Sequence, residues 1–201
     1  MKIMKKYISF ALMTIALSFG FASCDVETNE EPGGTNVQNM AGRWVVSVSQ
    51  VDENGNVKYQ PEDLFGIMDI DLLTFNTAAN SSTEMWIDDD GNFWAFKFKM
   101  LVDYVAGTFS VTNVPYDAAN QEIADAIAAG QTPKDKDGND LVAETATISD
   151  GKIMYGAGHN IHGMPTDSIA FYITFTDDTY AAKYGYVKHL VTGTRYSGFY
   201  E

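Results

Sequence analysis

Apolar side chains alternate with polar ones along several short segments of this chain, and turn residues separate those segments. The clearest case is the run Ile169, Phe171, Ile173 and Phe175, in which every second residue is large and apolar. A period of two is typical of a strand with one face on a core and one in solvent. We expect about eight to ten such strands and almost no helix, which indicates an all-β sandwich or barrel.

The stretch 85–100 is predicted to form a β-hairpin. Its loop is placed at Asp90-Gly91, because Gly adopts positive φ freely and Asp tolerates it. This register puts Met85 opposite Phe96 and Ile87 opposite Trp94 on one apolar face. Phe98 and Met100 continue that face, and the other face carries Trp86, Asp88, Phe93, Ala95, Lys97 and Lys99.

Three further local patterns give expectations about the strands. The alternation of Met68, Ile70 and Leu72 stops at residues 73–75, which predicts a bulge or a bend. Asp150-Gly151 predicts a turn between strands at 142–149 and 152–156. Residues 115–142 form an insertion, in which Asn120 is expected to cap a short helix through residues 121–129. This insertion is either a lid or a surface excursion without a role.

The N-terminus has the pattern of a secretory signal peptide. Lys2, Lys5 and Lys6 precede an apolar run from Ile8 to Phe21, and small residues lead to Cys24, the single cysteine of the chain. This end resembles the lipobox of bacterial lipoproteins, with Phe21 in place of the usual Leu. We therefore expect a signal peptide at residues 1–23 and lipidation of Cys24. Ordinary cleavage that leaves a free thiol, or an uncleaved anchor, are the alternatives.

The mature chain would be acidic and anchored in the cell envelope, as an outer-membrane lipoprotein that faces either the periplasm or the surface. Loss of three lysines and no acids lowers the formal net charge from −14 to −17, which disfavours nucleic acid as a partner. Residues 24–40 are polar and acidic and predict a flexible tether. Residues 41–201 are long enough for a single domain with a real core.

Two residues far apart in the chain favour a barrel over a sandwich. Gly42-Arg43-Trp44 lies in the first predicted strand and Arg195 in the last. The pattern resembles the Gly-X-Trp and late Arg of lipocalin-like (calycin) barrels, which implies that Trp44 closes one barrel end and that Arg195 stacks on it. A guanidinium over an indole contributes about 0.5–2 kcal/mol. The fold expected is an antiparallel up-and-down calycin-like β-barrel with one short helical insertion.

Several longer segments resemble one family of small bacterial lipoproteins, the lipid-binding putative hydrolases. The resemblance covers most of residues 41–199, apart from the insertion 115–142, and brings no catalytic residues that can be carried over. The segments that carry it are Ala41-Gly42-Arg43-Trp44, Leu73-Thr74-Phe75-Asn76-Thr77-Ala78, Met85-Trp86-Ile87-Asp88, Asp167-Ser168-Ile169 and Gly193-Thr194-Arg195-Tyr196-Ser197-Gly198-Phe199.

The inward aromatic and aliphatic residues allow two interpretations. They either line a pocket for a lipid or another small apolar molecule, or they fill the barrel. The ligand-binding candidates are Trp94, Phe96, Phe98, Phe171, Ile173 and Phe175. A binder needs an apolar cavity of about 300 Å³ or more. A filled barrel with an exposed apolar patch would instead indicate a structural or interaction lipoprotein with unknown protein partners.

Hydrolysis and metal binding have weaker support. Ser168 with Asp167 and either His159 or His162 could form a triad, which geometry rather than order defines. However, the chain has no Gly-X-Ser-X-Gly elbow. His159 and His162 lack obvious partner ligands, and the Asp-rich segment 135–140 does not fit the EF-hand spacing. We predict no cofactor and no metal site, and we leave enzymatic activity open.

Overall fold

The computed structural model describes residues 34–160 and 162–198. The predicted signal peptide at residues 1–23 and the lipidation site Cys24 lie outside the described residues. The described residues from Thr35 onward form one compact unit. This unit begins six residues before the expected domain boundary at residue 41. Among the described helices, none has the length and apolar character needed to cross a membrane.

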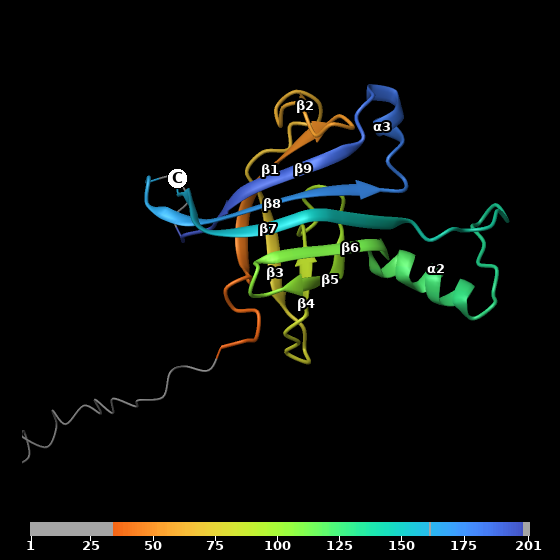
Figure 1. The fold of residues 1–201 in the computed structure, drawn as a ribbon. Helices are drawn as coiled ribbons and strands as arrows, with labels where there is room; N and C mark the ends of the chain where they lie inside the picture. Colours follow the sequence, from red (N-terminus) through yellow and green to blue (C-terminus); the bar gives the residue numbers. More distant parts are fainter. Residues whose placement is uncertain (1–33, 161, 199–201) are drawn as a thin grey trace, which may run out of the picture. The chain divides into compact units, whose positions relative to one another are not determined.

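Within the described residues, eight strands form a closed antiparallel barrel (Figure 1). These strands are β1 (Gly42–Val51), β3 (Ile70–Asn76), β4 (Glu84–Asp88), β5 (Lys97–Asp103), β6 (Thr108–Pro115), β7 (Thr145–His159), β8 (Pro165–Phe175) and β9 (Lys188–Arg195). Each pairs with the next, and β1 pairs with β9 to close the ring. A short strand, β2 (Val57–Tyr59), pairs with the end of β1. The all-β up-and-down barrel is therefore confirmed; the alternation predicted a sandwich or a barrel, and the Gly-X-Trp pattern with a late Arg favoured the barrel.

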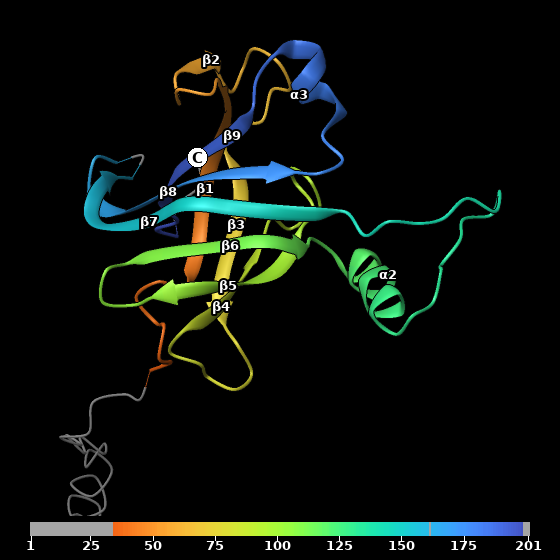
Figure 2. The ribbon, with the colours of Figure 1, turned by 45° about the vertical axis from the view of Figure 1, so that its right-hand side comes forward.

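In the described part of the chain, two short helices accompany the barrel (Figure 2). The first, α2 (Ala118–Ala128), lies in the insertion as predicted, but it begins three residues earlier than expected. Its N-cap is Asp117, whose side chain accepts a hydrogen bond from the main-chain N–H of Asn120. The second, α3 (Thr179–Tyr184), was not predicted. Its N-cap is Asp178, and Gly185 ends it in the left-handed conformation.

The hairpin of β4 and β5 forms, but the predicted register is wrong. Met85 lies opposite Met100 and Ile87 opposite Phe98. The connection is the longer 89–96 loop, rather than a two-residue turn at Asp90-Gly91. Because the register differs by an even number of residues, the apolar face predicted for Met85, Ile87 and Phe98 still points inward.

Two predicted breaks are absent from the strands. β3 continues through residues 73–75 without a bulge, because Thr74 takes the inward position and its hydroxyl is hydrogen-bonded there. Asp150-Gly151 is a bulge inside the single long strand β7, where Asp150 has a φ of 54°. A Cβ at Gly151 would collide with Phe109 of β6, so a residue without a side chain is needed here. Met68, expected to point inward, is 46% exposed.

Candidate functional site

Trp44 closes one end of the barrel, which we call the Trp44 end. The indole is fully buried, and the guanidinium carbon of Arg195 lies 4.4 Å from its ring centre. The two residues are direct neighbours in the pairing of β1 with β9. The indole N–H donates to the Thr74 hydroxyl at 2.9 Å, and this hydroxyl donates to the main-chain oxygen of Met40 at 2.7 Å.

The guanidinium of Arg195 ties this end to the segment before β1. Its Nε donates to Asp167 at 3.0 Å, and its two terminal nitrogens donate to the main-chain oxygens of Asn39 and Ala41. A Cβ at Gly42 would collide with Arg195 Nη1, so glycine leaves room for the guanidinium. Val37 and Met40 of the expected tether are fully buried and cover the Trp44 end.

The predicted ligand-binding residues pack against one another in the barrel interior. The ring of Trp94 stacks on Phe175 with 4.5 Å between centres, and Phe96 contacts Phe98 at 5.3 Å. Phe171 and Ile173 are also buried. The cavity that borders Phe96 and Phe171 measures about 10 Å³, which holds one water at most. Among the described hollows, none of ligand size is lined by Trp94, Phe96, Phe171, Ile173 or Phe175, whereas Phe98 also lines an outer groove that is described below.

The 89–96 loop covers the other end of the barrel, which we call the His189 end. The buried carboxylate of Asp89 shapes this loop by accepting four main-chain hydrogen bonds. One oxygen accepts from Phe93, Trp94 and Ala95 at 3.0, 2.7 and 2.9 Å, and the other accepts from Gly91 at 3.1 Å. A carboxylate that receives several main-chain N–H groups makes strong, charge-assisted bonds, so the loop is rigidly placed.

A buried acid–imidazole pair lies under this loop. His189 Nε2 is 2.9 Å from an oxygen of Asp178, and the Tyr186 hydroxyl donates to the same carboxylate. Burial raises the pKa of Asp178, but the hydrogen bonds from His189 and Tyr186 outweigh it and leave that pKa below its ordinary value. Burial beside this carboxylate raises the pKa of Tyr186. Asp178 is therefore ionised at neutral pH, and His189 Nε2 must carry the proton between them.

Two buried polar atoms at the His189 end have no hydrogen-bond partner among the described residues. They are Nδ1 of His189 and Oε1 of Gln50, which belong to directly paired residues of β9 and β1. The sequence reasoning missed this cluster. The alternation of His189 with Val191 along the last strand would have placed the imidazole inside the barrel, but Asp178 lies in an irregular segment that offered no such pattern.

The catalytic candidates do not assemble into a triad. Ser168 of β8 lies opposite Met154 and Thr194, and among the described residues no histidine is hydrogen-bonded to it. His159 pairs with Pro165, three residues before Ser168 in β8, so it is not the neighbour of Ser168 across the strands. His162 is exposed in the loop after β7, and Asp167 binds Arg195 at the Trp44 end.

A groove on the outside of the barrel has the size of a ligand site. It measures about 380 Å³ and lies between the first turns of α2 and the outer face of β4, β5 and β6. We call it the α2 groove. It is lined by Trp86, Lys97, Phe98, Lys99, Val114, Pro115, Asp117, Ala118 and Gln121, and most of its surface is apolar. Small-molecule sites range from about 300 to 1,000 Å³, so the groove falls within this range.

Aromatic and cationic groups lie side by side in the α2 groove. Trp86 stacks on Phe75 with an interplanar angle of 16°. Lys99, its direct neighbour across β4 and β5, holds its ammonium 5.9 Å from the indole centre. Lys97 pairs with Asp88 at 2.8 Å. Among the described residues no acidic group pairs with Lys99, so the groove has one cation without a carboxylate.

Hydrogen bonds in the first turn of α2 and just before the helix hold α2 in place as the wall of this groove. The buried amide of Asn120 accepts from the main-chain N–H of Glu144, just before β7. The main-chain oxygen of Tyr116 accepts from Lys97 N–H at 2.7 Å. The Tyr116 hydroxyl donates to Asp177 at 2.9 Å, and burial and this hydrogen bond raise its pKa to about 12. Tyr116 therefore stays a donor at neutral pH and keeps the groove in shape.

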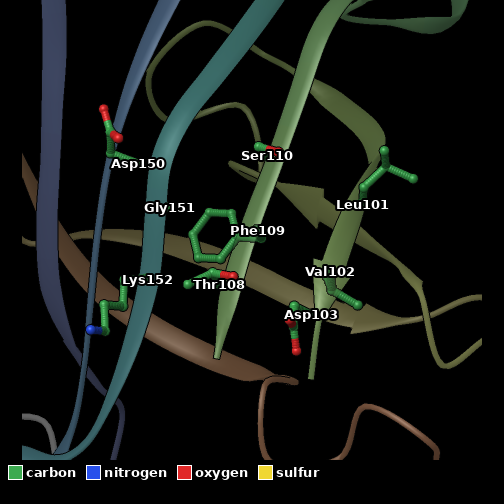
Figure 3. Close-up of a pocket in the computed structure, with 9 residues that line it drawn as sticks. All are labelled: Leu101, Val102, Asp103, Thr108, Phe109, Ser110, Asp150, Gly151 and Lys152. Carbon is green, nitrogen blue, oxygen red and sulfur yellow. The ribbon is translucent and has the colours of Figure 1, made fainter. Parts of the chain in front are cut away.

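A second hollow, of about 610 Å³, lies over β5, β6 and β7 (Figure 3). It is more open to solvent than the α2 groove and exposes proportionally more polar surface. Asp103 and Asp150 place two carboxylates on its border, beside Lys152. Leu101, 61% exposed, adds an apolar side chain. Hydration of these acids disfavours an apolar ligand here.

Metal-ligand chemistry is sparse in the described part of the chain. No group of three or more His, Cys, Asp or Glu residues there is placed to hold an ion. In the acidic segment 135–140, the Asp135 carboxylate accepts main-chain hydrogen bonds from Asp137 and Asn139. Lys134, just before this segment, forms an ion pair with Asp140 at its end. These contacts build a turn.

The fold defines an all-β barrel protein with a packed centre. Among its described hollows, the mainly apolar one of ligand size lies on the outside of the barrel. The family of lipid-binding putative hydrolases matches residues 29–200. The chain therefore belongs to this family, as its sequence motifs indicated. A comparison with curated proteins found no match.

Proposed function

We propose that this protein is an outer-membrane-anchored lipoprotein of the cell envelope that binds a lipid-like ligand in the α2 groove. Its family supports lipid binding. The volumes support the outer site, because the interior cavity beside Phe96 and Phe171 is about 10 Å³ and the groove about 380 Å³. A ligand inside the barrel would first have to displace close-packed aromatic rings, which costs several kcal/mol.

The apolar lining of the α2 groove is the observation that carries this proposal. Trp86, Val114, Pro115 and Ala118 offer an apolar surface that the barrel core does not cover. An acyl chain that covers it gains roughly 25 cal/mol per Å² of apolar area removed from water. The fixed position of α2 adds to this gain, because a preformed groove loses little conformational freedom on binding.

The envelope anchor rests on the N-terminal sequence, with its lysines, apolar run and Cys24. Two or three acyl chains on Cys24 would hold the protein at the membrane stably. We expect Cys24→Ser to move the protein from the membrane fraction to the soluble fraction. A C24S protein that stays at the membrane and keeps residues 1–23 would instead identify the signal segment as an anchor.

Groove-filling substitutions test the site. We would produce residues 25–201, which contain the whole compact unit, and measure binding of a lauroyl ester by native mass spectrometry and titration. Ala118→Phe places a ring in the groove and should weaken binding at least tenfold. Ala119→Phe adds the same ring to the neighbouring position outside the lining and should leave binding unchanged.

Binding that survives Ala118→Phe would exclude the α2 groove. A chain that binds no acyl compound at all would contradict lipid binding and favour an interaction lipoprotein with a filled barrel. The hydrolase alternative predicts that Ser168→Ala abolishes ester turnover. The positions of Ser168 and the histidines support binding rather than turnover, because no described histidine reaches the hydroxyl.

A further inference from the structure

The distribution of charge around the α2 groove extends the proposed function, on which this inference rests. The chain carries 27 acidic and 13 basic residues, so most of its surface repels anions. Lys97 and Lys99 are nevertheless the charged residues of β5 that line the groove, whereas Asp103 on the same outer face borders the hollow over β5–β7. The two lysines stand two positions apart in the strand.

The two lysines differ in what they already bind. Lys97 forms an ion pair with Asp88 at 2.8 Å, and its ammonium lies 5.4 Å from the centre of the Phe75 ring. Lys99 lies over the Trp86 indole, and no described carboxylate pairs with it. Lys99 can therefore take an anionic group without breaking an existing ion pair.

The one carboxylate that lines the groove is already occupied. Asp117 caps α2, and its Oδ1 accepts from both the main-chain and the side-chain nitrogen of Asn120, at 2.7 and 3.0 Å. The negative charge of Asp117 lies at the N-terminus of α2, where it interacts favourably with the helix dipole. The hollow over β5–β7 differs, because the carboxylates of Asp103 and Asp150 border it. An anionic head group is thus better matched to the α2 groove.

We propose that the α2 groove selects a single-chain anionic amphiphile, with its carboxylate or phosphate head at Lys99 and its chain over Trp86 toward Val114 and Pro115. The volume of about 380 Å³ supports one chain rather than two, because it lies near the lower end of the range of ligand sites. Lys99 is then the residue that determines head-group specificity, while the apolar floor supplies most of the affinity.

Four ligands with the same twelve-carbon chain test this selectivity on residues 25–201: dodecanoate, dodecyl phosphate, dodecanol and dodecyltrimethylammonium, each below its micelle concentration. We expect the two anions to bind more tightly than dodecanol, and dodecanol more tightly than the cation. Lys99→Gln should weaken dodecanoate roughly threefold to tenfold, the usual range for a partly exposed charged contact. It should leave dodecanol unchanged, and Lys99→Arg should restore anion binding.

Lys152→Gln is the matched control, because it removes the same charge from the hollow over β5–β7. Equal weakening by Lys152→Gln and Lys99→Gln would show that only net charge matters and would overturn the inference. Equal binding of all four ligands would overturn the anion selectivity and leave the proposed lipid binding intact. Binding of none of the four would overturn both. If only dodecyl phosphate responds to Lys99→Gln, the head group is a phosphate rather than a carboxylate.

Discussion

The two ends of the barrel are both closed by a tryptophan, but they are held by different chemistry. At the Trp44 end, a guanidinium covers the ring and donates hydrogen bonds to a carboxylate and to two main-chain oxygens. At the His189 end, Trp94 stacks on Phe175 above a buried acid–imidazole pair. Two polar atoms there, on His189 and Gln50, have no partner among the described residues.

The two ends are expected to differ in how their stability depends on pH. Arg195 is charged at any physiological pH, and both of its terminal nitrogens donate to main-chain oxygens, which acid does not titrate. The His189 end depends on an ionised Asp178, and it keeps unsatisfied polar atoms that cost free energy. Among the described hollows, the one inside the barrel between the two ends measures about 10 Å³. The comparison therefore supports a ligand site outside the barrel.

Truncation of the two tryptophans should give the largest contrast. Trp44→Ala removes a fully buried ring and leaves Arg195 without its stacking partner, so the free energy of unfolding should fall by about 3–5 kcal/mol. Trp94 is only partly buried, and Trp94→Ala should cost about 1–3 kcal/mol. Urea unfolding of both variants measures this. A cost below about 1 kcal/mol for Trp44→Ala would remove the argument that this residue closes the barrel.

The second largest contrast between the two ends is expected in how the free energy of unfolding changes as the pH is lowered. The folded pKa of Asp178 is lowered, so its contribution to stability is complete above the unfolded pKa of about 3.9 and is lost as the pH falls through the folded value. Asp178→Asn should reduce stability at pH 7 by about 2–4 kcal/mol. The loss relative to wild type should shrink below about pH 4.

Unfolding curves at several pH values between 7 and 3 test this, with the exposed carboxylate Glu122 changed to Gln as the control. A deficit for Asp178→Asn that stays constant from pH 7 to pH 3 would show that the carboxylate contributes nothing as an ion.

The smallest expected change in stability comes from filling the space that Gly42 leaves for the guanidinium of Arg195. Gly42→Ala would place a Cβ against Nη1 of Arg195. We expect a loss of about 1–3 kcal/mol, as is usual for an overpacked site. The loss should become smaller in an Arg195→Ala background, because the collision then disappears. Equal costs of Gly42→Ala in both backgrounds would show that the glycine serves the backbone rather than the guanidinium.

The sequence predicted the strands because alternation is a short-range pattern, and it predicted the barrel and one of its ends because a resemblance joins two distant positions, Trp44 and Arg195. Alternation assigned the inward face of β8, and the Gly-X-Trp motif with a late Arg indicated the Trp44 end. The register of β4 and β5 could not be read in this way. Asp90-Gly91 suits a tight turn, but the neighbouring Asp89 accepts four main-chain hydrogen bonds and stabilises a longer loop instead.

The candidate site was harder to predict than the fold. The α2 groove requires the docking of an inserted helix onto the outer face of the barrel, and Asn120 achieves this by binding Glu144 rather than by capping the helix. Lys99 and Trp86 were assigned to the polar face of the hairpin, which is correct, but no local pattern shows that a helix converts that face into a groove. The His189–Asp178 pair likewise joins a strand to the start of α3.

The position of the ligand is the central claim, and the three tryptophans report on it independently. Trp86 lies in the α2 groove, Trp44 at one barrel end and Trp94 at the other. The most direct measurement is a titration of residues 25–201 with dodecanoate, followed by the NMR signals of the three indole N–H groups. We predict that the Trp86 signal shifts with saturation while Trp44 and Trp94 stay in place. A shift of Trp94 or Trp44 with an unchanged Trp86 would place the ligand in the barrel and contradict this account.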